Sequence, residues 1–180
     1  MLTATADPVL SLSQAVAGDQ TAFAGIVREH QAMVYSIGWH FLRDRAMAEE
    51  MAQDVFLHLY RNLGSIESAR HLTHWLRKVA THRCIDQARR RKLVRWSDLE
   101  HVREPVAAES GRDPMLAGLL ARLVAGLPPK PRMMVILRYQ EDLEPAEIAD
   151  LLEIPLGTVK SGLHRALALL RSKMEKETVQ

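Results

Sequence analysis

Apolar residues at helical spacing are the feature of this sequence that most limits how the chain can fold. Between residues 46 and 63 they recur three or four positions apart, which places them on one face of a helix. The residues on that face are Ala48, Met51, Ala52, Val55, Phe56 and Leu59. Alternation of apolar and polar residues, the pattern of a half-buried strand, is almost absent. The sequence therefore predicts an all-α fold.

Similar periodicity predicts the other helices and a break between two groups of them. The further helices are expected over 22–39, 72–92, 115–127, 132–140, 145–152 and 155–175. Segment 93–114 instead carries five acids, three arginines and no sustained apolar stripe. We interpret it as a flexible linker, so the 180 residues are expected to form two small helical domains, 8–92 and 115–176.

The single cysteine and the short apolar runs argue against a disulfide-bonded, secreted or membrane-spanning protein. The chain holds 24 Lys and Arg against 22 Asp and Glu, a formal net charge of +2. Cys84 is the only cysteine, so no disulfide forms within the chain. No apolar run approaches the roughly 20 residues that span a bilayer, and no basic segment precedes the apolar residues at the N-terminus. We expect a cytoplasmic protein without direct membrane insertion.

The end of the chain separates its charges sharply. The stretch EDLEPAEIADLLE, residues 141–153, has six acids and no base, whereas IPLGTVKSGLHRALALLR, residues 154–171, has no acid. Two short amphipathic helices joined by the turn EIPL predict a helix-turn-helix, whose second helix enters the major groove of DNA. Off its apolar stripe lie Thr158, Lys160, Ser161, His164 and Arg165. A solvated helix surface is the alternative interpretation of the same pattern.

A second basic segment favours nucleic acid over a merely solvated surface. Residues 77–95 contain eight Lys or Arg and one acid, a formal charge of +7. Trp75 and His82 lie beside this charge, and aromatic rings next to a cationic track suit unstacked single-stranded bases. Trp75 fits the helix core better than a stacking platform. The segment therefore predicts phosphate binding along the second half of its helix.

Three other kinds of function have to be compared with the nucleic-acid interpretation: metal binding, regulation of DNA by the chain alone, and hydrolysis. His71, His74, His82 and Cys84 are metal-ligand types, but their spacing matches no compact zinc signature. A DNA-binding regulator that acts alone would use the C-terminal helix equally well. A hydrolytic enzyme is disfavoured because no nucleophile elbow, phosphate-cradling glycine loop or paired-acid site is present. We expect no metal, no cofactor and no enzymatic activity.

Five blocks of sequence, in order, resemble one family. They are GDQTAFAGIVREH from Gly18, AEEMAQDVFLHLYRNL from Ala48, HWLRKVATHRCIDQARRRK from His74, the linker, and LPPKPRMMVILRYQEDLEPAEIADLLEIPLGTVKSGLHRALALLR from Leu127. Over nearly its whole length the chain resembles a bacterial RNA polymerase sigma factor of the extracytoplasmic-function (ECF) group. The resemblance implies promoter-specific transcription initiation with core RNA polymerase, and usually an anti-sigma protein that restrains it.

The resemblance also implies roles for individual residues. Glu50, Gln53, Asp54 and Leu57 match the surface that docks on the clamp of the largest polymerase subunit. The resemblance implies the polymerase flap as a second contact. Residues matching the part that melts and binds the single-stranded minus-ten element are Ile66, Ser68, His74, Arg77, Lys78, His82, Arg83, Arg89 and Arg90. Residues matching the reader of the duplex minus-thirty-five element are Thr158, Lys160, Ser161, His164 and Arg165.

Two positions depart from the family pattern. His82 stands where the family often has Asn, so the minus-ten preference of relatives does not carry over. Gly162 stands where TVKSRLHRA has Arg, which removes an expected phosphate contact and costs about 1 kcal/mol of helix propensity. We expect weaker minus-thirty-five binding than in a typical relative, and tighter, more salt-dependent binding after Gly162→Arg.

Overall fold

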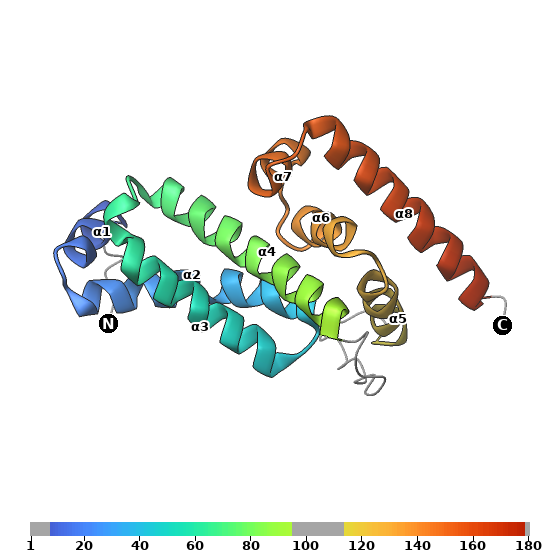
Figure 1. The fold of residues 1–180 in the computed structure, drawn as a ribbon, viewed down its shortest axis with the longest axis horizontal. Coiled ribbons are helices and arrows are strands. Elements are labelled where there is room, and N and C mark those ends of the chain that lie inside the picture. The colour runs from blue at the N-terminus through green and yellow to red at the C-terminus, as the bar shows by residue number, and fades with distance from the viewer. Residues whose placement is uncertain (1–7, 95–113, 179–180) are drawn as a thin grey trace.

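The structure, a computed structural model, describes residues 8–94 and 114–178. Across these ranges the chain is helical and forms no strand, which confirms the predicted all-α class (Figure 1). The elements are α1 Pro8–Val16, α2 Gln20–Leu42, α3 Arg45–Asn62, a 3-10 turn Leu63–Ser65, α4 Ala69–Val94, α5 Pro114–Ala125, α6 Pro129–Tyr139, α7 Pro145–Leu152 and α8 Leu156–Thr178. None of the helices in this part of the chain has the length and apolarity needed to cross a membrane.

The N-terminal group packs α2, α3 and α4 side by side, with α1 against them (Figure 1). Its core includes the fully buried side chains of Ile37, Phe41, Leu59 and Leu76. The predicted stripe of 46–63 is confirmed, because Met51 and the other members of that face lie inside or at the edge of this core. The opposite face of α3 is exposed.

The C-terminal group places α7 and α8 as a helix-turn-helix over α6. Val159 of α8, Ile148 and Leu151 of α7, and Leu137 of α6 are almost fully buried in the core that these helices share. The turn begins at Glu153, whose backbone adopts the left-handed conformation with φ 54°. This residue ends α7 and redirects the chain into α8, so both helices predicted at the end of the sequence are confirmed.

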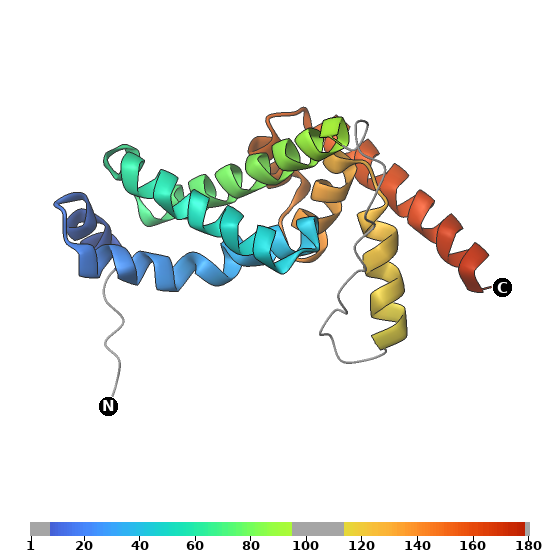
Figure 2. The ribbon, with the colours of Figure 1, turned by 60° about the horizontal axis from the view of Figure 1, so that its bottom comes forward.

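The two groups pack against each other. α4 contacts α6 and α7, and α2 contacts α6. The C-terminal group therefore lies against α2 and α4 of the N-terminal group (Figure 2). Ser36 Oγ of α2 donates a hydrogen bond of 2.9 Å to Glu141 Oε1 after α6. Arg132 of α6 donates to the carbonyl of Phe41 in α2 at 3.2 Å and stacks on its ring. The linker predicted for 93–114 falls largely on 95–113, outside the described residues.

Some local predictions differ from the structure. Helix α1 was not predicted, and α4 begins at Ala69 rather than Leu72 because Ser68 Oγ accepts from the backbone N–H of His71. Helical spacing predicts that Ala146 and Leu167 lie on the buried faces of 145–152 and 155–175, but both are exposed. Both lie at the margin of an apolar stripe, where helical periodicity alone does not show how far the neighbouring helix reaches.

Candidate nucleic-acid and polymerase interfaces

The start of α8 presents the predicted duplex-reading residues on one exposed face. All five are exposed, while Val159, Leu163 and Ala166 of the same helix are buried. Arg165 Nε donates to the carbonyl of Ser161 at 3.2 Å, so its guanidinium folds back along the helix surface. The five residues are Thr158, Lys160, Ser161, His164 and Arg165. Their arrangement provides hydrogen-bonding and cationic groups with no acid among them.

Gly162 does not lie on that exposed face. It is buried, and a Cβ built on it would come within 2.7 Å of the Met134 sulfur on α6. The first atom of a side chain here would therefore meet the flexible end of Met134 in the packing between α8 and α6. The effect of Gly162→Arg on DNA binding therefore stays a prediction, and the close approach of the two helices at this position is what the sequence pattern did not show.

The side chains of the loop before α4 are mainly buried or used in capping that helix, rather than available to DNA. Ile66 is buried at 6% exposure, so the predicted minus-ten contact of its side chain is unavailable in this arrangement. Ser68 is exposed and caps α4 through the N–H of His71. His71 Nδ1 in turn accepts from the N–H of Glu67 at 3.2 Å. These bonds fix the entry into α4.

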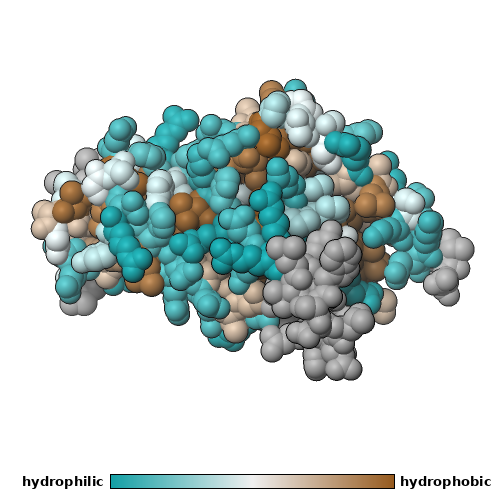
Figure 3. All heavy atoms as spheres, viewed as in Figure 1, coloured by the Kyte–Doolittle hydropathy of each residue, from teal (hydrophilic) through white to brown (hydrophobic). Residues whose placement is uncertain are grey.

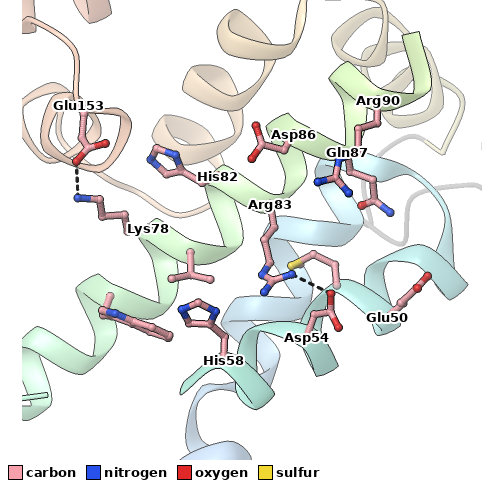
Figure 4. Close-up of a pocket in the computed structure, with 13 residues that line it drawn as sticks. Glu50, Asp54, His58, Lys78, His82, Arg83, Asp86, Gln87, Arg90 and Glu153 are labelled. Carbon is pink, nitrogen blue, oxygen red and sulfur yellow. Dashed lines mark hydrogen bonds and ion pairs between the residues drawn. The ribbon is translucent and has the colours of Figure 1, made fainter. Parts of the chain in front are cut away.

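The cationic face of α4 is occupied by acids and carbonyls. Lys78 Nζ lies 2.7 Å from Glu153 Oε1, and Arg83 Nη1 lies 2.9 Å from Asp54 Oδ2 on α3 (Figure 4). His82 Nε2 lies 3.0 Å from the Leu151 carbonyl. A further contact, of 3.4 Å, joins His74 Nε2 to Asp150 Oδ2. Three of these four contacts reach α7 or the residue that ends it, which the sequence did not predict.

Arg77 turns inward between the two groups. It is half-buried, and its Nε is buried with no hydrogen-bond partner among the described residues. Its charge acts on Glu141, where burial raises the carboxyl pKa, while the Ser36 hydrogen bond and the Arg77 charge lower it. This side chain therefore belongs to the contact between the groups rather than to an open DNA surface.

The last described side chains of α4 stay on the surface. Arg89 and Arg90 are exposed, and Arg89 Nη1 lies 3.5 Å from Asp86 Oδ1. Arg90 lines a cavity of about 690 Å³ between α3, α4 and the end of α7, together with Asp86 and Gln87 (Figure 4). These arginines remain available to phosphate.

The outer face of α3 carries the predicted polymerase contacts. Glu50, Gln53 and Asp54 are exposed, and the Leu57 side chain is 55% exposed. Gln53 and Leu57 line a groove of about 670 Å³ between α2 and α3. Its floor also includes Phe23 and Tyr60, whose rings meet edge to face at 5.1 Å. The sequence predicted the acids but missed the two aromatic rings.

The groove is one of several places where large apolar side chains reach the surface. The view in Figure 3 shows hydrophilic residues over most of one face, with apolar surface broken into separate patches. Tyr60 is 53% exposed, close to Leu57 along α3. Apolar surface beside acids suits a partner that offers both basic and apolar groups.

The histidines and the cysteine do not converge. Within the described ranges, no three His, Cys, Asp or Glu side chains form a group that could hold a metal ion. Cys84 is buried, and burial raises the pKa of its thiol to about 12. The thiolate needed for metal binding or nucleophilic attack is therefore strongly disfavoured there.

Comparison with known proteins agrees with this arrangement of helices. Residues 26–94 match the Sigma-70 region 2 family and residues 117–170 match Sigma-70, region 4. The chain is 31% identical over 176 residues to the ECF RNA polymerase sigma factor SigW of Bacillus subtilis, covering 91% of this chain and 94% of that protein. It is 31% identical over 159 residues to the RNA polymerase sigma-E factor of Streptomyces coelicolor, covering 87% and 88%.

Solved structures show the same fold at lower identity. CnrH, solved in complex with the cytosolic domain of CnrY, matches with a TM-score of 0.69 and 19% identity, over 93% of this chain and 96% of that one. The sigma factor RpoE of Bartonella quintana, solved in complex with the anti-sigma factor NepR, matches with a TM-score of 0.69 and 18% identity, over 85% and 96%.

The matches cover both halves of the chain. A helix-turn-helix regulator that acts alone would account for residues 117–170 but not for the match over 26–94. Sigma factors act in transcription initiation and are not themselves enzymes. The helical fold, the exposed basic face of α8 and the agreement over both regions lead to one conclusion: the chain belongs to the sigma-70 family, in its ECF group.

Proposed function

We propose a division of labour between the two parts of this ECF sigma factor. The unit 8–92 binds core RNA polymerase and takes up the single-stranded minus-ten element. The unit 115–176 reads the duplex minus-thirty-five element, and 93–114 joins them. Through this division the chain directs core polymerase to specific promoters, in the cytoplasm where that enzyme works.

The exposed face of α8 is the observation that carries this proposal. Lys160, His164 and Arg165 stand clear of the core on the second helix of a helix-turn-helix, with Thr158 and Ser161 beside them. Such a helix places its first turns in the major groove, where these side chains contact base edges and phosphates. The Gln53 and Leu57 end of the α2–α3 groove gives the polymerase clamp its docking surface.

Transcription with purified core polymerase tests the whole proposal. The chain is added to core enzyme lacking any sigma factor, on a library of randomised promoter templates, and the transcripts are sequenced. We expect start sites that share two sequence elements at a fixed spacing. Transcription no more selective than that of core enzyme alone would contradict the proposal.

A paired variant locates the polymerase contact. Leu57→Arg places a cation at the 55% exposed position on α3, and Val16→Arg does the same at a 49% exposed position on α1. We expect Leu57→Arg to lose co-elution with core polymerase in gel filtration and Val16→Arg to keep it. Equal behaviour of the two variants would remove α3 from the docking surface.

We also propose an anti-sigma partner for this chain. The RpoE structure with the same fold was solved bound to the anti-sigma factor NepR, and CnrH was solved bound to the cytosolic domain of CnrY. A protein that covers the α2–α3 groove or the α8 face would block the surfaces assigned above to polymerase and DNA. Co-purification of the chain from its native cell tests this proposal: a bound partner protein should be recovered with the chain and should be released when the response is induced.

A further inference from the structure

We propose that Gly157 is the point of closest approach between α8 and duplex DNA: its missing side chain lets the first turn of the helix rest against base edges in the major groove. This inference rests on the proposed function, because that function gives the exposed face of α8 its duplex. It adds a residue that acts through the space it leaves, whereas Lys160 and Arg165 act through charge.

The first evidence is the place of Gly157 on α8. Ser161, His164 and Arg165 lie four, seven and eight positions after it, so Gly157 shares their face of the helix, one turn nearer its start. It is exposed, as these three residues are. In a helix-turn-helix, the N-terminal residues of the second helix contact base edges. The glycine therefore lies where that contact is made.

The second evidence is that the described fold gives this position no need for glycine. A Cβ built on Gly157 would meet no atom within 4 Å, so the packing leaves room for a side chain. Among the described glycines only Gly18 has a positive φ, so the helical backbone at position 157 accepts other residues. Because glycine in a helix costs free energy relative to alanine, it brings the free chain no gain here.

Two other helical glycines put this observation in proportion. At Gly162, on the buried side of the same helix, a Cβ would come within 2.7 Å of Met134 Sδ. At Gly118 in α5 a Cβ would meet no atom within 4 Å, as at Gly157. Open space alone therefore does not mark a contact, and the inference depends on the exposed face that surrounds Gly157. Gly118 provides the matched control.

The residues next to Gly157 suit contact by close packing. Pro155 and Leu156 precede it, both exposed, with Leu156 at 40%. The first cation of the helix, Lys160, follows only three positions later. A helix start without long polar side chains can touch base edges directly, including the methyl group of thymine, while cations farther along reach phosphates. Figure 1 shows α8 beginning beside α7 at the outer edge of the molecule.

Gly157→Ala and Gly118→Ala test the inference in holoenzyme made from the full-length chain and core polymerase. The probe is a labelled duplex with the minus-thirty-five sequence that wild-type holoenzyme selects from the randomised promoter templates. We expect Gly157→Ala to weaken binding of this duplex about fivefold, because a methyl group overpacks the closest contact. Gly118→Ala should bind the duplex as wild type does.

The stability of the free chain gives a second readout. Both substitutions replace glycine by a better helix former in open space, so the urea midpoint should stay the same or rise in each variant. A merely structural role for Gly157 would lower the midpoint and the affinity together. Weaker binding at equal or higher stability therefore belongs to the DNA contact.

A third variant separates close approach from charge. Gly157→Lys adds a cation to a face that binds phosphates, so charge alone predicts tighter binding. The inference predicts binding weaker than that of Gly157→Ala, because a longer side chain holds the helix farther from the base pairs.

Each outcome decides the inference. Wild-type affinity in Gly157→Ala, a lower urea midpoint in that variant, an equal loss in Gly118→Ala, or tighter binding by Gly157→Lys would overturn it. A wild-type holoenzyme that selects no minus-thirty-five sequence would instead contradict the proposed function, before any variant is compared.

Discussion

At Gly162 the backbone of α8 comes close to the side chain of Met134 on α6. The α8 backbone passes so near α6 that a Cβ would lie 2.7 Å from the Met134 sulfur and 3.3 Å from its methyl carbon. Met134 is 3% exposed, so its side chain has little room to move away. A side chain at position 162 therefore requires the end of Met134 to shift, and the cost of that shift competes with the gain in helix propensity.

The Gly162–Met134 contact predicts that the effect of Gly162→Ala on the free energy of unfolding changes sign when the Met134 side chain is shortened. Gly162→Ala should destabilise the chain by about 1 kcal/mol, because overpacking outweighs the gain in helix propensity. In a Met134→Ala background, the same change should stabilise it by about 1 kcal/mol, since the new methyl group enters vacated space. Urea unfolding of the four proteins in the cycle measures this coupling, and simple additivity would refute the contact.

Local caps set the ends of single helices, and the spacing of apolar residues sets which face of each helix is buried. Asp19 Oδ1 accepts from the N–H groups of Thr21 at 2.7 Å and Ala22 at 3.1 Å, which fixes the start of α2. Asp44 does the same for α3 through Met47 at 3.1 Å. Such caps supply acceptors that the first turn of a helix lacks, so these aspartates set where the chain enters its N-terminal group.

The cap of α2 can be tested without touching any proposed interface. Asp19→Ala should lower the free energy of unfolding by about 1 kcal/mol, because two backbone donors lose their acceptor. Asp19→Asn keeps a side-chain oxygen and should cost much less. Chemical denaturation compares the two, and equal losses would mean that the carboxylate acts only by its charge.

The exposed face of α8 makes a prediction about salt. Lys160→Ala and Arg165→Ala should each weaken binding to duplex promoter DNA and reduce the steepness of its salt dependence by about one released ion. Lys176→Ala, an exposed lysine in the last turn of the same helix, serves as the matched control. Titrations of holoenzyme with labelled duplex at several salt concentrations measure both quantities. If all three substitutions change the salt dependence of binding equally, the DNA contact lies elsewhere on α8.

For the whole molecule, packing between helices controls the state of its ionisable groups. His30 and His40 on α2 are half-buried, and burial is the main cause that lowers both imidazole pKa values below 6.5. Arg77 of α4 lowers that of His30 further, and Arg43 that of His40, whereas Glu29 raises that of His30. The folded chain therefore favours the neutral form of both side chains.

The sign of the pH dependence follows from these two histidines. Because their pKa values are lower in the folded chain than in the unfolded one, their contribution to stability is complete above pH 6.5 and is lost as the pH falls below it. The free energy of unfolding should decline over that range, and His30→Gln with His40→Gln should flatten the decline. Replacing exposed His164 by Gln is the control, and a slope unaffected by the double variant would contradict the assignment.

The sequence by itself determined the helical class, most of the helix limits and the α8 face. These features depend on periodicity and caps, which involve residues a few positions apart. The predicted acids of α3 and cations of α8 are exposed for the same local reason. Their roles toward polymerase and DNA stay predictions, as do the limits of the two domains.

The tertiary structure alone decided what the α4 cations face and what a side chain at position 162 would meet. The sequence showed the acids of 141–153 only as a block of negative charge, but the fold brings Glu153 to Lys78 and Asp150 to His74. It also turns Arg77 inward and brings Met134 against Gly162. Residues far apart in the chain meet only through the packing of whole helices, and helical periodicity shows which face is buried but not against which partner it lies.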